Sequence, residues 1–435
     1  MDKIKIVWLC HFSNKNVRKR LPIKNMKFWN YIQVLLGHQP LKTNDFAPWV
    51  SNLILEFEKF ENIELHIVAP HLLLKKKTEF SLNGIHYHFF PSDYIYPWNV
   101  FYNKLFPNQK NKFKRNRKFI KNFILKINPD LVNLIGSESP YYSIGVLDIK
   151  NIPIFVSCQT IYTNPKRKLL ETISPIRWNV ELKIHKKVLY YGCSGRLHRD
   201  LIIRNNPNAH IFKMFFPITK PPVIEKCDKE YDFALWGRIT KSKGIEDAIK
   251  ALAIVKRAYP MVTMHIIGGC EISYREQLIK GIDSLGLSKN IDLIGFFPIH
   301  MDMFKHVSKA RYAVLPNKLD IISSTLFEAA LLKIPTVTYK TTGSPFLNKD
   351  KESVLLASIG DINELANQMI KLLANEKLSK DLTENAYNFV EKEFNNETSA
   401  KRLLYDYYAI IDHYKYGALI PEKLLFNLKE FPIYK

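Results

Sequence analysis

The sequence predicts an α/β protein built from two doubly wound, Rossmann-like domains. Short apolar stretches of strand length alternate with longer stretches of helical periodicity, a pattern typical of parallel sheets covered by helices. The 435 residues exceed one ordinary core, and two domains of about 200 residues are the natural division. Pro217, Pro221 and Pro222 interrupt both periodicities. We therefore expect domains at residues 1–222 and 223–435.

Each domain is expected to hold a series of buried parallel strands. In the first domain the apolar stretches are 4–10, 63–69, 85–90, 131–135, 152–157 and 188–191. In the second they are 231–236, 262–267, 291–295, 313–316 and 336–339. After residue 360 the pattern is helical, and we expect the final helices, around 403–414, to return to the first domain.

The positive charge is concentrated in the first domain. The net charge is +23, and residues 1–222 hold 35 Lys and Arg against 14 Asp and Glu, whereas residues 223–435 hold 29 against 27. The densest stretch contains no acid and consists of Lys104, Lys110, Lys112, Lys114, Arg115, Arg117, Lys118 and Lys121. It follows a group of aromatic residues between Tyr94 and Phe106. Aromatic rings beside a polybasic stretch suit an anionic membrane surface. The main alternative to membrane binding is that these cations form a solvated charged face. A third interpretation is nucleic-acid binding, which we do not expect.

Cysteine usage and hydropathy indicate a cytoplasmic protein. The five cysteines are scattered, with no Cys-x-x-Cys pair, so neither a disulfide framework nor a zinc site is expected from them. The first apolar stretch, 4–10, is too short for a signal peptide, and no stretch approaches 18 apolar residues. Together with the charge pattern, this predicts a protein bound peripherally at the inner face of the cell membrane.

The most informative motif is the loop from Gly237 to Gly244. It follows an apolar strand and precedes a helix whose apolar residues recur with helical spacing. Unpaired N–H groups and the helix dipole attract anions at such a helix start. Arg238 adds a planar fork for phosphate oxygens and Lys243 a movable charge. The loop therefore predicts a diphosphate site, with a surface loop that binds nothing as the alternative.

A second motif lies about 80 residues further along the chain. Asp320 is followed by the hydroxyl run Ser323, Ser324 and Thr325, and then by Glu328 at a predicted helix start. Hydroxyls and free N–H groups there can hold phosphate or sugar oxygens. The alternative is a capping box, in which Glu328 returns to the backbone of the first turn from Thr325.

Together these motifs resemble the nucleotide-sugar half of retaining GT-B glycosyltransferases, family 4 (glycosyl transferases group 1) in particular. The resemblance implies a GT-B architecture, in which two Rossmann-like domains face a cleft. It implies that Arg238 and Lys243 hold the donor diphosphate, that Asp320 meets the sugar hydroxyls and that Glu328 meets the ribose. The family usually has Glu where Asp320 stands, and its Gly-Phe-Gly is replaced by residues 321–323.

Candidates on the acceptor side lie in the first domain. Gln159 aligns with a family position that often carries a His in contact with the donor sugar, and an amide there would orient without transferring protons. The alternative is a buried Gln whose amide is hydrogen bonded to backbone groups. His11 and Asn14 follow the first strand, where this fold usually borders the acceptor. Arg196 lies near a helix start and could reach an acceptor phosphate, with a plain surface Arg as the alternative.

The resemblance implies a glycosyltransferase of the hexosyltransferase type. The sequence has no Asp-x-Asp metal motif, no His-Glu-x-x-His, no Gly-x-Ser-x-Gly and no Walker loop. We therefore expect neither metal nor cofactor, and the leaving diphosphate to be stabilised by Arg238, Lys243 and backbone amides. The resemblance implies retention, with a nucleoside diphosphate sugar as donor and a glycan or lipid-linked acceptor in surface polysaccharide synthesis. The alternatives are a same-fold sugar-nucleotide epimerase and a non-enzymatic basic protein that binds membrane or nucleic acid.

Overall fold

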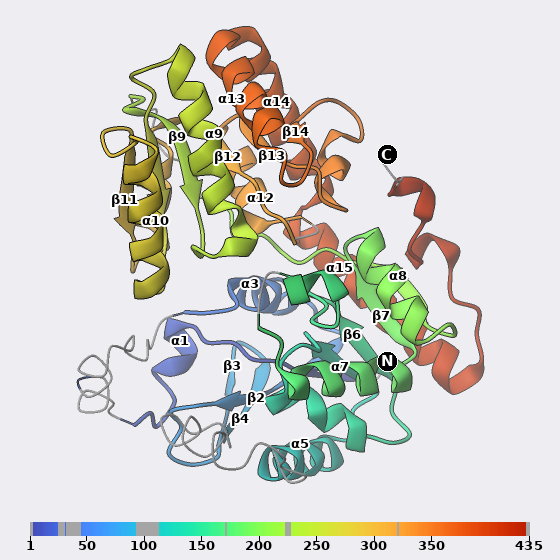
Figure 1. The fold of residues 1–435 in the computed structure, drawn as a ribbon. Helices are drawn as coiled ribbons and strands as arrows, with labels where there is room; N and C mark the ends of the chain where they lie inside the picture. The colour runs from blue at the N-terminus through green and yellow to red at the C-terminus, as the bar shows by residue number, and fades with distance from the viewer. Residues whose placement is uncertain are drawn as a thin grey trace.

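Two sheets of largely parallel strands, each covered by helices, form the protein. The computed structural model describes residues 3–24, 31, 45–92, 113–169, 172–221, 228–319 and 322–431. Figure 1 shows the first sheet and its helices as the lower half of the molecule and the second sheet as the upper half. The predicted α/β class with two Rossmann-like units is confirmed. The exact boundary at residues 222 and 223 stays a prediction.

The first sheet has the strand order β3-β4-β2-β1-β5-β6-β7-β8. All neighbours within it are parallel except the edge pair β3 and β4. Its strands are β1 Ile4–Leu9, β2 Ile63–His71, β3 Thr78–Leu82, β4 Ile85–Pro91, β5 Leu131–Ile135, β6 Ile154–Ser157, β7 Tyr190–Cys193 and β8 His210–Lys213. All six strands predicted for this half are present, while β3 and β8 are additional.

Both faces of the first sheet are buried. Alternate residues of β1 belong to different cores, because Trp8 packs with Phe57 of α3 on one face and Leu9 with Phe123 of α5 on the other. The helices of this half are α1 Lys15–Arg18, α3 Pro48–Phe57, α5 Lys114–Ile127, α6 Pro140–Ser143, α7 Pro175–Lys187 and α8 Arg196–Asn205.

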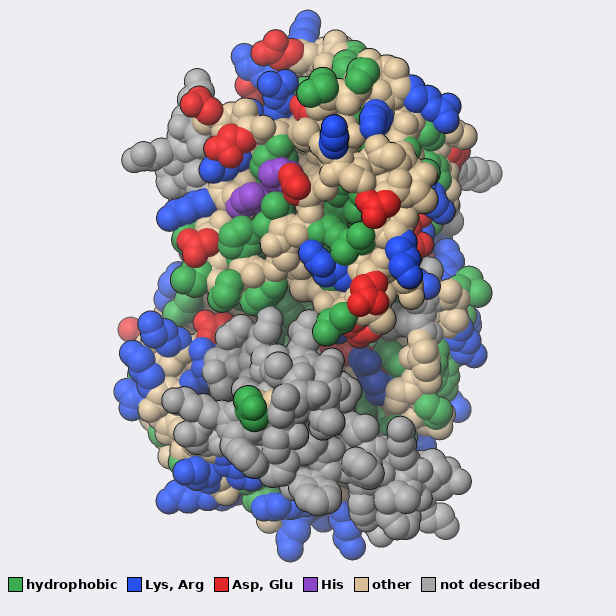
Figure 2. All heavy atoms as spheres, turned by 60° about the vertical axis from the view of Figure 1, so that its left-hand side comes forward, with side chains coloured by type: hydrophobic (Ala, Val, Ile, Leu, Met, Phe, Trp, Pro, Cys, Tyr) green, Lys and Arg blue, Asp and Glu red, His purple; other side chains and the backbone are tan. Residues whose placement is uncertain are grey.

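Only part of the polybasic stretch falls on described residues. Residues 104–112 and the aromatic group at 94–106 lie outside them. The remainder begins α5, whose apolar face is buried against the sheet. Arg117 donates through Nε to Asp148 Oδ2 at 2.7 Å, while the exposed cations are Lys114, Arg115, Lys118 and Lys121. Figure 2 shows Lys and Arg side chains around the lower half of one face and mixed charges over the upper half.

The second sheet has the order β11-β10-β9-β12-β13-β14, with every neighbouring pair parallel. Its strands are β9 Tyr231–Trp236, β10 Met264–Ile267, β11 Ile291–Gly295, β12 Ala310–Leu315, β13 Thr336–Tyr339 and β14 Leu355–Ala357. Its helices are α9 Ile245–Ala258, α10 Ile272–Ser284, α11 His300–Val307, α12 Ser324–Leu331, α13 Ile362–Ala374 and α14 Glu376–Glu393. Every predicted strand of this half is present, and β14 is additional.

The last long helix, α15 Asn396–Tyr416, packs against the first sheet. Leu403 and Tyr407 belong to the same core as Trp8, and Asn133 Nδ2 donates to Tyr407 Oη at 2.6 Å. Figure 1 shows α15 passing from the upper half of the molecule to the lower. Among the described residues, no helix is both long and apolar enough to cross a membrane.

Candidate functional site

The loop from Gly237 to Gly244 joins the end of β9 to the start of α9. A short 3-10 turn, Lys241–Lys243, leads into Gly244, which has φ 69° and is the N-cap of α9. A Cβ at Gly244 would lie 2.2 Å from the Pro316 carbonyl oxygen, so only glycine fits there. This close approach brings the loop against the chain that follows β12.

The same loop crosses the chain after β10. A Cβ at Gly268 would lie 1.7 Å from the Gly237 carbonyl oxygen. Gly237 N donates to Ile267 O at 3.0 Å, and Ile239 N donates to Gly269 O at 3.0 Å. These bonds fix the loop backbone, whereas the Arg238 side chain is exposed. Within the described ranges, no hydrogen bond or ion pair engages that guanidinium, which leaves its donors available to a ligand.

The two motifs predicted from the sequence meet at the start of α12. Lys243 Nζ lies 3.4 Å from Ser323 Oγ, which in turn lies 2.9 Å from Thr325 Oγ1. Ser323 and Thr325 are buried, while Ser324 is exposed at the first helical position. A cation and two hydroxyls therefore surround a helix N-terminus, where oxyanions are favoured. Asp320 lies outside the described residues, so its expected contact with the sugar stays a prediction.

Glu328 faces β9 and not the first turn of its own helix. Its Oε2 accepts a hydrogen bond from Trp236 Nε1 at 2.7 Å, and its Oε1 lies 3.8 Å from His300 Nε2. Ser323 and not Thr325 occupies the N-cap position, and no side chain makes a capping hydrogen bond there, so the capping-box interpretation is wrong. Burial raises the pKa of Glu328 to about 7, although Trp236 and the nearby Lys243 favour its charged form.

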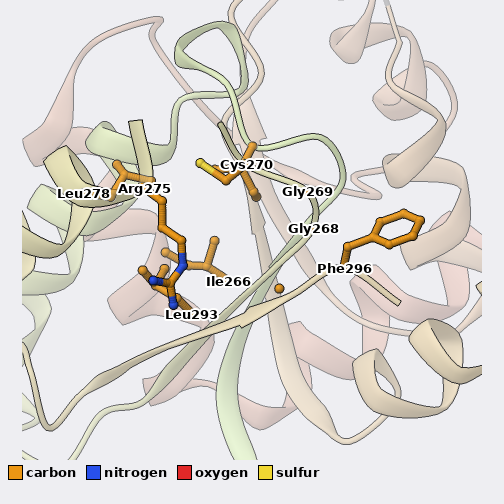
Figure 3. A pocket seen from close by; sticks show the side chains of 10 residues that line it. Ile266, Gly268, Gly269, Cys270, Arg275, Leu278, Leu293 and Phe296 are labelled. Carbon is orange, nitrogen blue, oxygen red and sulfur yellow. The ribbon is translucent and has the colours of Figure 1, made fainter. Parts of the chain in front are cut away.

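A cavity of roughly 200 Å³ opens beside this loop at the ends of β9, β10 and β11. Figure 3 shows Arg275 and Phe296 on opposite sides of it, with Gly268 and Gly269 between them. Phe296 follows β11 and its side chain is 49% exposed. The full lining is Ile239, Ile266, Gly268, Gly269, Cys270, Arg275, Leu278, Leu293, Gly295 and Phe296. Of these residues, only loop member Ile239 belongs to a motif singled out in the sequence.

The candidates of the first half gather at the ends of neighbouring strands. His11 follows β1 and Gln159 follows β6, and the strands lie in the order β1-β5-β6. His11 Nδ1 is hydrogen bonded to Tyr141 Oη, and burial lowers the pKa of His11 to about 3, so its imidazole is neutral. Asn14 supports the local backbone, because its side chain caps α1 by accepting from Val17 N at 2.9 Å.

A buried carboxyl, Glu138, lies between these candidates and was missed by the sequence analysis. It follows β5, and with the Gln159 amide turned to satisfy both groups, Gln159 donates to Glu138 Oε1 at 3.3 Å and accepts from Trp49 Nε1 at 2.7 Å. Burial raises the pKa of Glu138 to about 7, and its Oε2 has no partner among the described residues. The side chain of Arg196, at the start of α8, lies 3.5 Å from Asp200 Oδ2.

The comparisons with known proteins agree with this geometry. Residues 219–389 match the family model described as glycosyl transferases group 1. The chain is 26% identical over 168 residues to the capsular polysaccharide biosynthesis glycosyltransferase CapM of Staphylococcus aureus, a match that covers 37% of this chain and 41% of CapM. It is 22% identical over 384 residues to an uncharacterized glycosyltransferase of Methanocaldococcus jannaschii, covering 82% of this chain and 94% of that protein.

Similarity to solved structures extends over nearly the whole chain. The crystal structure of Anabaena HepE in complex with UDP and glucose superposes with a TM-score of 0.61 at 14% identity. The superposition covers 92% of this chain and 98% of HepE. At this identity the likeness concerns the fold alone.

Proposed function

We propose that the chain transfers a sugar from a nucleoside diphosphate sugar to a glycan or lipid-linked acceptor. The premise is that residues 219–389 of this GT-B protein form a glycosyl transferases group 1 domain. One observation carries the proposal. Lys243, the hydroxyl pair at the start of α12 and the Glu328 carboxyl come together beside the cavity at the ends of β9–β11. That arrangement offers a cation, a helix N-terminus and a carboxyl to one ligand.

The donor is proposed to bind across these groups and the adjoining cavity. Arg238 and Lys243 take the diphosphate together with the N-terminus of α12, and Glu328 accepts from the ribose hydroxyls. The cavity takes the nucleobase, which stacks on Phe296. The UDP in the HepE complex supports a nucleoside diphosphate as ligand of this fold. Asp320 is proposed to meet the sugar hydroxyls.

The proposed chemistry depends on fixed positive charge. As the sugar leaves, the diphosphate gains negative charge, and Arg238 and Lys243 stabilise it more strongly in the transition state than in the ground state. We propose transfer with retention, in which the acceptor hydroxyl approaches from the leaving-group face and a donor phosphate oxygen takes its proton. With two cations and helix-start amides on the diphosphate, the proposed step requires no metal and no cofactor.

The acceptor is proposed to bind at the first half, beside His11, Gln159 and Arg196. This half carries most of the excess positive charge of the chain, which would attract a phosphate-linked lipid acceptor and an anionic membrane surface. The exposed cations of α5 support such docking. CapM is a capsular polysaccharide biosynthesis glycosyltransferase, and this likeness supports a role in surface polysaccharide synthesis at the inner face of the membrane.

The test is a thermal-shift panel of UDP-, GDP- and ADP-sugars on the full chain and three variants. A ligand at 100 times its dissociation constant adds about 2.7 kcal/mol to the folded state. One of the donors is expected to raise the Tm of the wild type and of Lys241→Ala, an exposed neighbour in the same loop, but not that of Arg238→Ala or Lys243→Ala. Equal shifts in all four proteins, or none with any donor, would contradict the donor site.

Product analysis then separates the reaction classes. A glycosyltransferase is expected to release nucleoside diphosphate only when an acceptor is supplied, apart from slow donor hydrolysis. A same-fold epimerase would change the sugar of the nucleotide without an acceptor. A basic binding protein would leave every donor intact.

A further inference from the structure

A cluster of His and Glu side chains lies on the first sheet, outside the site described above. We call it the His–Glu cluster, and it consists of Glu64 and His66 on β2 and His86 on β4. Figure 1 shows these two strands side by side in the lower half. The cluster occupies the same face of the sheet as Val68 and Phe90, which α5 covers, but it lies nearer the beginnings of the strands.

Strand geometry explains why the three side chains converge. Residues i and i+2 of a strand point to the same face, so Glu64 and His66 lie on one side of β2. The parallel pairing of β2 with β4 sets His86 directly beside His66, and their rings stack with centroids 4.8 Å apart. Each of the three residues offers one ligand atom, and these atoms all lie within 4.8 Å of one another.

We propose that Glu64, His66 and His86 bind a Zn²⁺ ion, with water completing its coordination. Imidazole nitrogen and carboxylate oxygen are ordinary zinc ligands, and at bond lengths of about 2.0–2.1 Å the ligand atoms of a tetrahedral site are roughly 3.3 Å apart. Glu64 Oε1 already lies 2.9 Å from His66 Nε2. The widest separation between ligand atoms, at most 4.8 Å, must shorten by roughly 1.5 Å to reach the tetrahedral spacing. Rotation of the partly exposed Glu64 and His86 side chains can supply this movement.

Polar side chains hold the second ring nitrogen of both imidazoles, and through His88 one of them is linked to a carboxylate. Metal-bound imidazoles usually donate their other ring N–H to a carboxylate, a carbonyl or water, which fixes the ring orientation. Here His66 Nδ1 lies 3.0 Å from His88 Nε2, and His88 Nδ1 lies 2.8 Å from Glu79 Oε2. His86 Nδ1 lies 2.8 Å from Ser81 Oγ. With each Nδ1 as the donor in these contacts, the Nε2 atoms of His66 and His86 keep their lone pairs for an ion.

The cluster is separate from the donor site, so the inference does not rest on the proposed function. Glu64 is paired with Lys5 near the beginning of β1, whereas His11 and the acceptor-side residues follow the ends of their strands. The donor-binding loop belongs to the other sheet. A bound ion would link β2 to β4 and stabilise this edge of the first half. Removing it should leave nucleotide binding unchanged.

The experiment titrates Zn²⁺ into untagged, chelator-treated full-length protein by isothermal calorimetry. The wild type is expected to bind one ion per chain, with a rise in Tm. Glu64→Gln and His86→Ala, both partly exposed positions, are expected to lower the affinity at least tenfold. His88→Gln, which keeps all three ligands, should lower it 10- to 100-fold, the usual effect of a second-layer partner. Co²⁺ in place of Zn²⁺ should give a visible spectrum that His86→Ala changes.

Two matched controls exclude other ligands. His210→Ala removes a partly exposed histidine from the opposite edge of the same sheet, and Cys270→Ser removes a partly exposed thiol of the second half. Both should bind Zn²⁺ like the wild type. Absence of binding to the wild type at 100 µM Zn²⁺, or equal affinity in wild type, Glu64→Gln and His86→Ala, would overturn the proposal.

Discussion

Replacing Glu328 by Gln is expected to make the protein more stable and its nucleotide binding weaker. The carboxyl side chain is only 12% exposed, and burial raises its pKa from 4.5 to about 7. Between pH 4.5 and 7 the folded state therefore holds a proton that the unfolded state has lost. The free energy of unfolding falls as pH rises through this window, and the loss is complete above it.

The magnitude follows from the shift. One pKa unit corresponds to 1.36 kcal/mol, so ionisation of Glu328 costs the folded state about 3 kcal/mol at pH 8. Gln carries no charge, and its amide oxygen can still accept the hydrogen bond from Trp236 Nε1. Glu328→Gln is thus expected to exceed the wild type in unfolding free energy by up to this amount at pH 8 and to match it near pH 4.5.

Nucleotide binding is expected to change in the opposite direction. If Glu328 accepts from ribose hydroxyls, loss of the charge removes about 1.5–3 kcal/mol of charge-assisted bonding, a 10- to 150-fold weaker Kd. Urea unfolding at pH 4.5 and 8, and calorimetry with the nucleoside diphosphate, measure the two effects. Glu276→Gln, an exposed acid on α10, should change neither. Unaltered affinity in Glu328→Gln would refute the ribose contact, and unaltered stability at pH 8 would refute the buried charge.

Three further changes test the rest of the proposed site. Arg238→Ala is expected to lower turnover by about 2.7–4 kcal/mol in activation free energy, 100- to 1000-fold, with an unchanged circular dichroism spectrum. Glu138→Gln should remove the contribution of Glu138 to the pH–rate profile near pH 7 at saturating donor and leave that of Glu328, because burial raises the pKa of each carboxyl to about 7. Serine at four exposed cations in the first half of α5, Lys114, Arg115, Lys118 and Lys121, should reduce cosedimentation with anionic but not neutral vesicles, while transfer to a short soluble acceptor survives.

The buried parallel strands could be predicted because burial on both faces makes them continuous apolar stretches. β9, with residues such as Phe233 and Leu235 in the core, is an example. β3 was not predicted because its residues at the sheet edge alternate between half-buried and exposed. Its local signal is Asn83-Gly84, both with positive φ, a pair typical of a two-residue hairpin turn. That dipeptide would have predicted the antiparallel edge pair.

The site was predictable where its chemistry is local in sequence. The Gly237–Gly244 loop and the stretch around Glu328 each carry their own pattern, and the structure sets Lys243 beside Ser323. The Trp236 partner of Glu328 was not predicted, because nothing local connects residues 92 positions apart. The cavity residues Arg275 and Phe296 were missed for the same reason. They come from different elements, and each one alone is an ordinary helix or loop residue.

The His–Glu cluster could be predicted only in part from local sequence. Glu64-x-His66 and His86-x-His88 both have the spacing of two, so the sequence alone sets each pair on one face of a strand. Whether the two pairs share a face depends on the pairing of β2 with β4, which places His66 opposite His86. A shift of the register by one residue would turn His86 to the other face, among the apolar side chains packed with Tyr87. The alternation that buries Tyr87 and Phe89 on one face is therefore what holds the imidazoles together on the other.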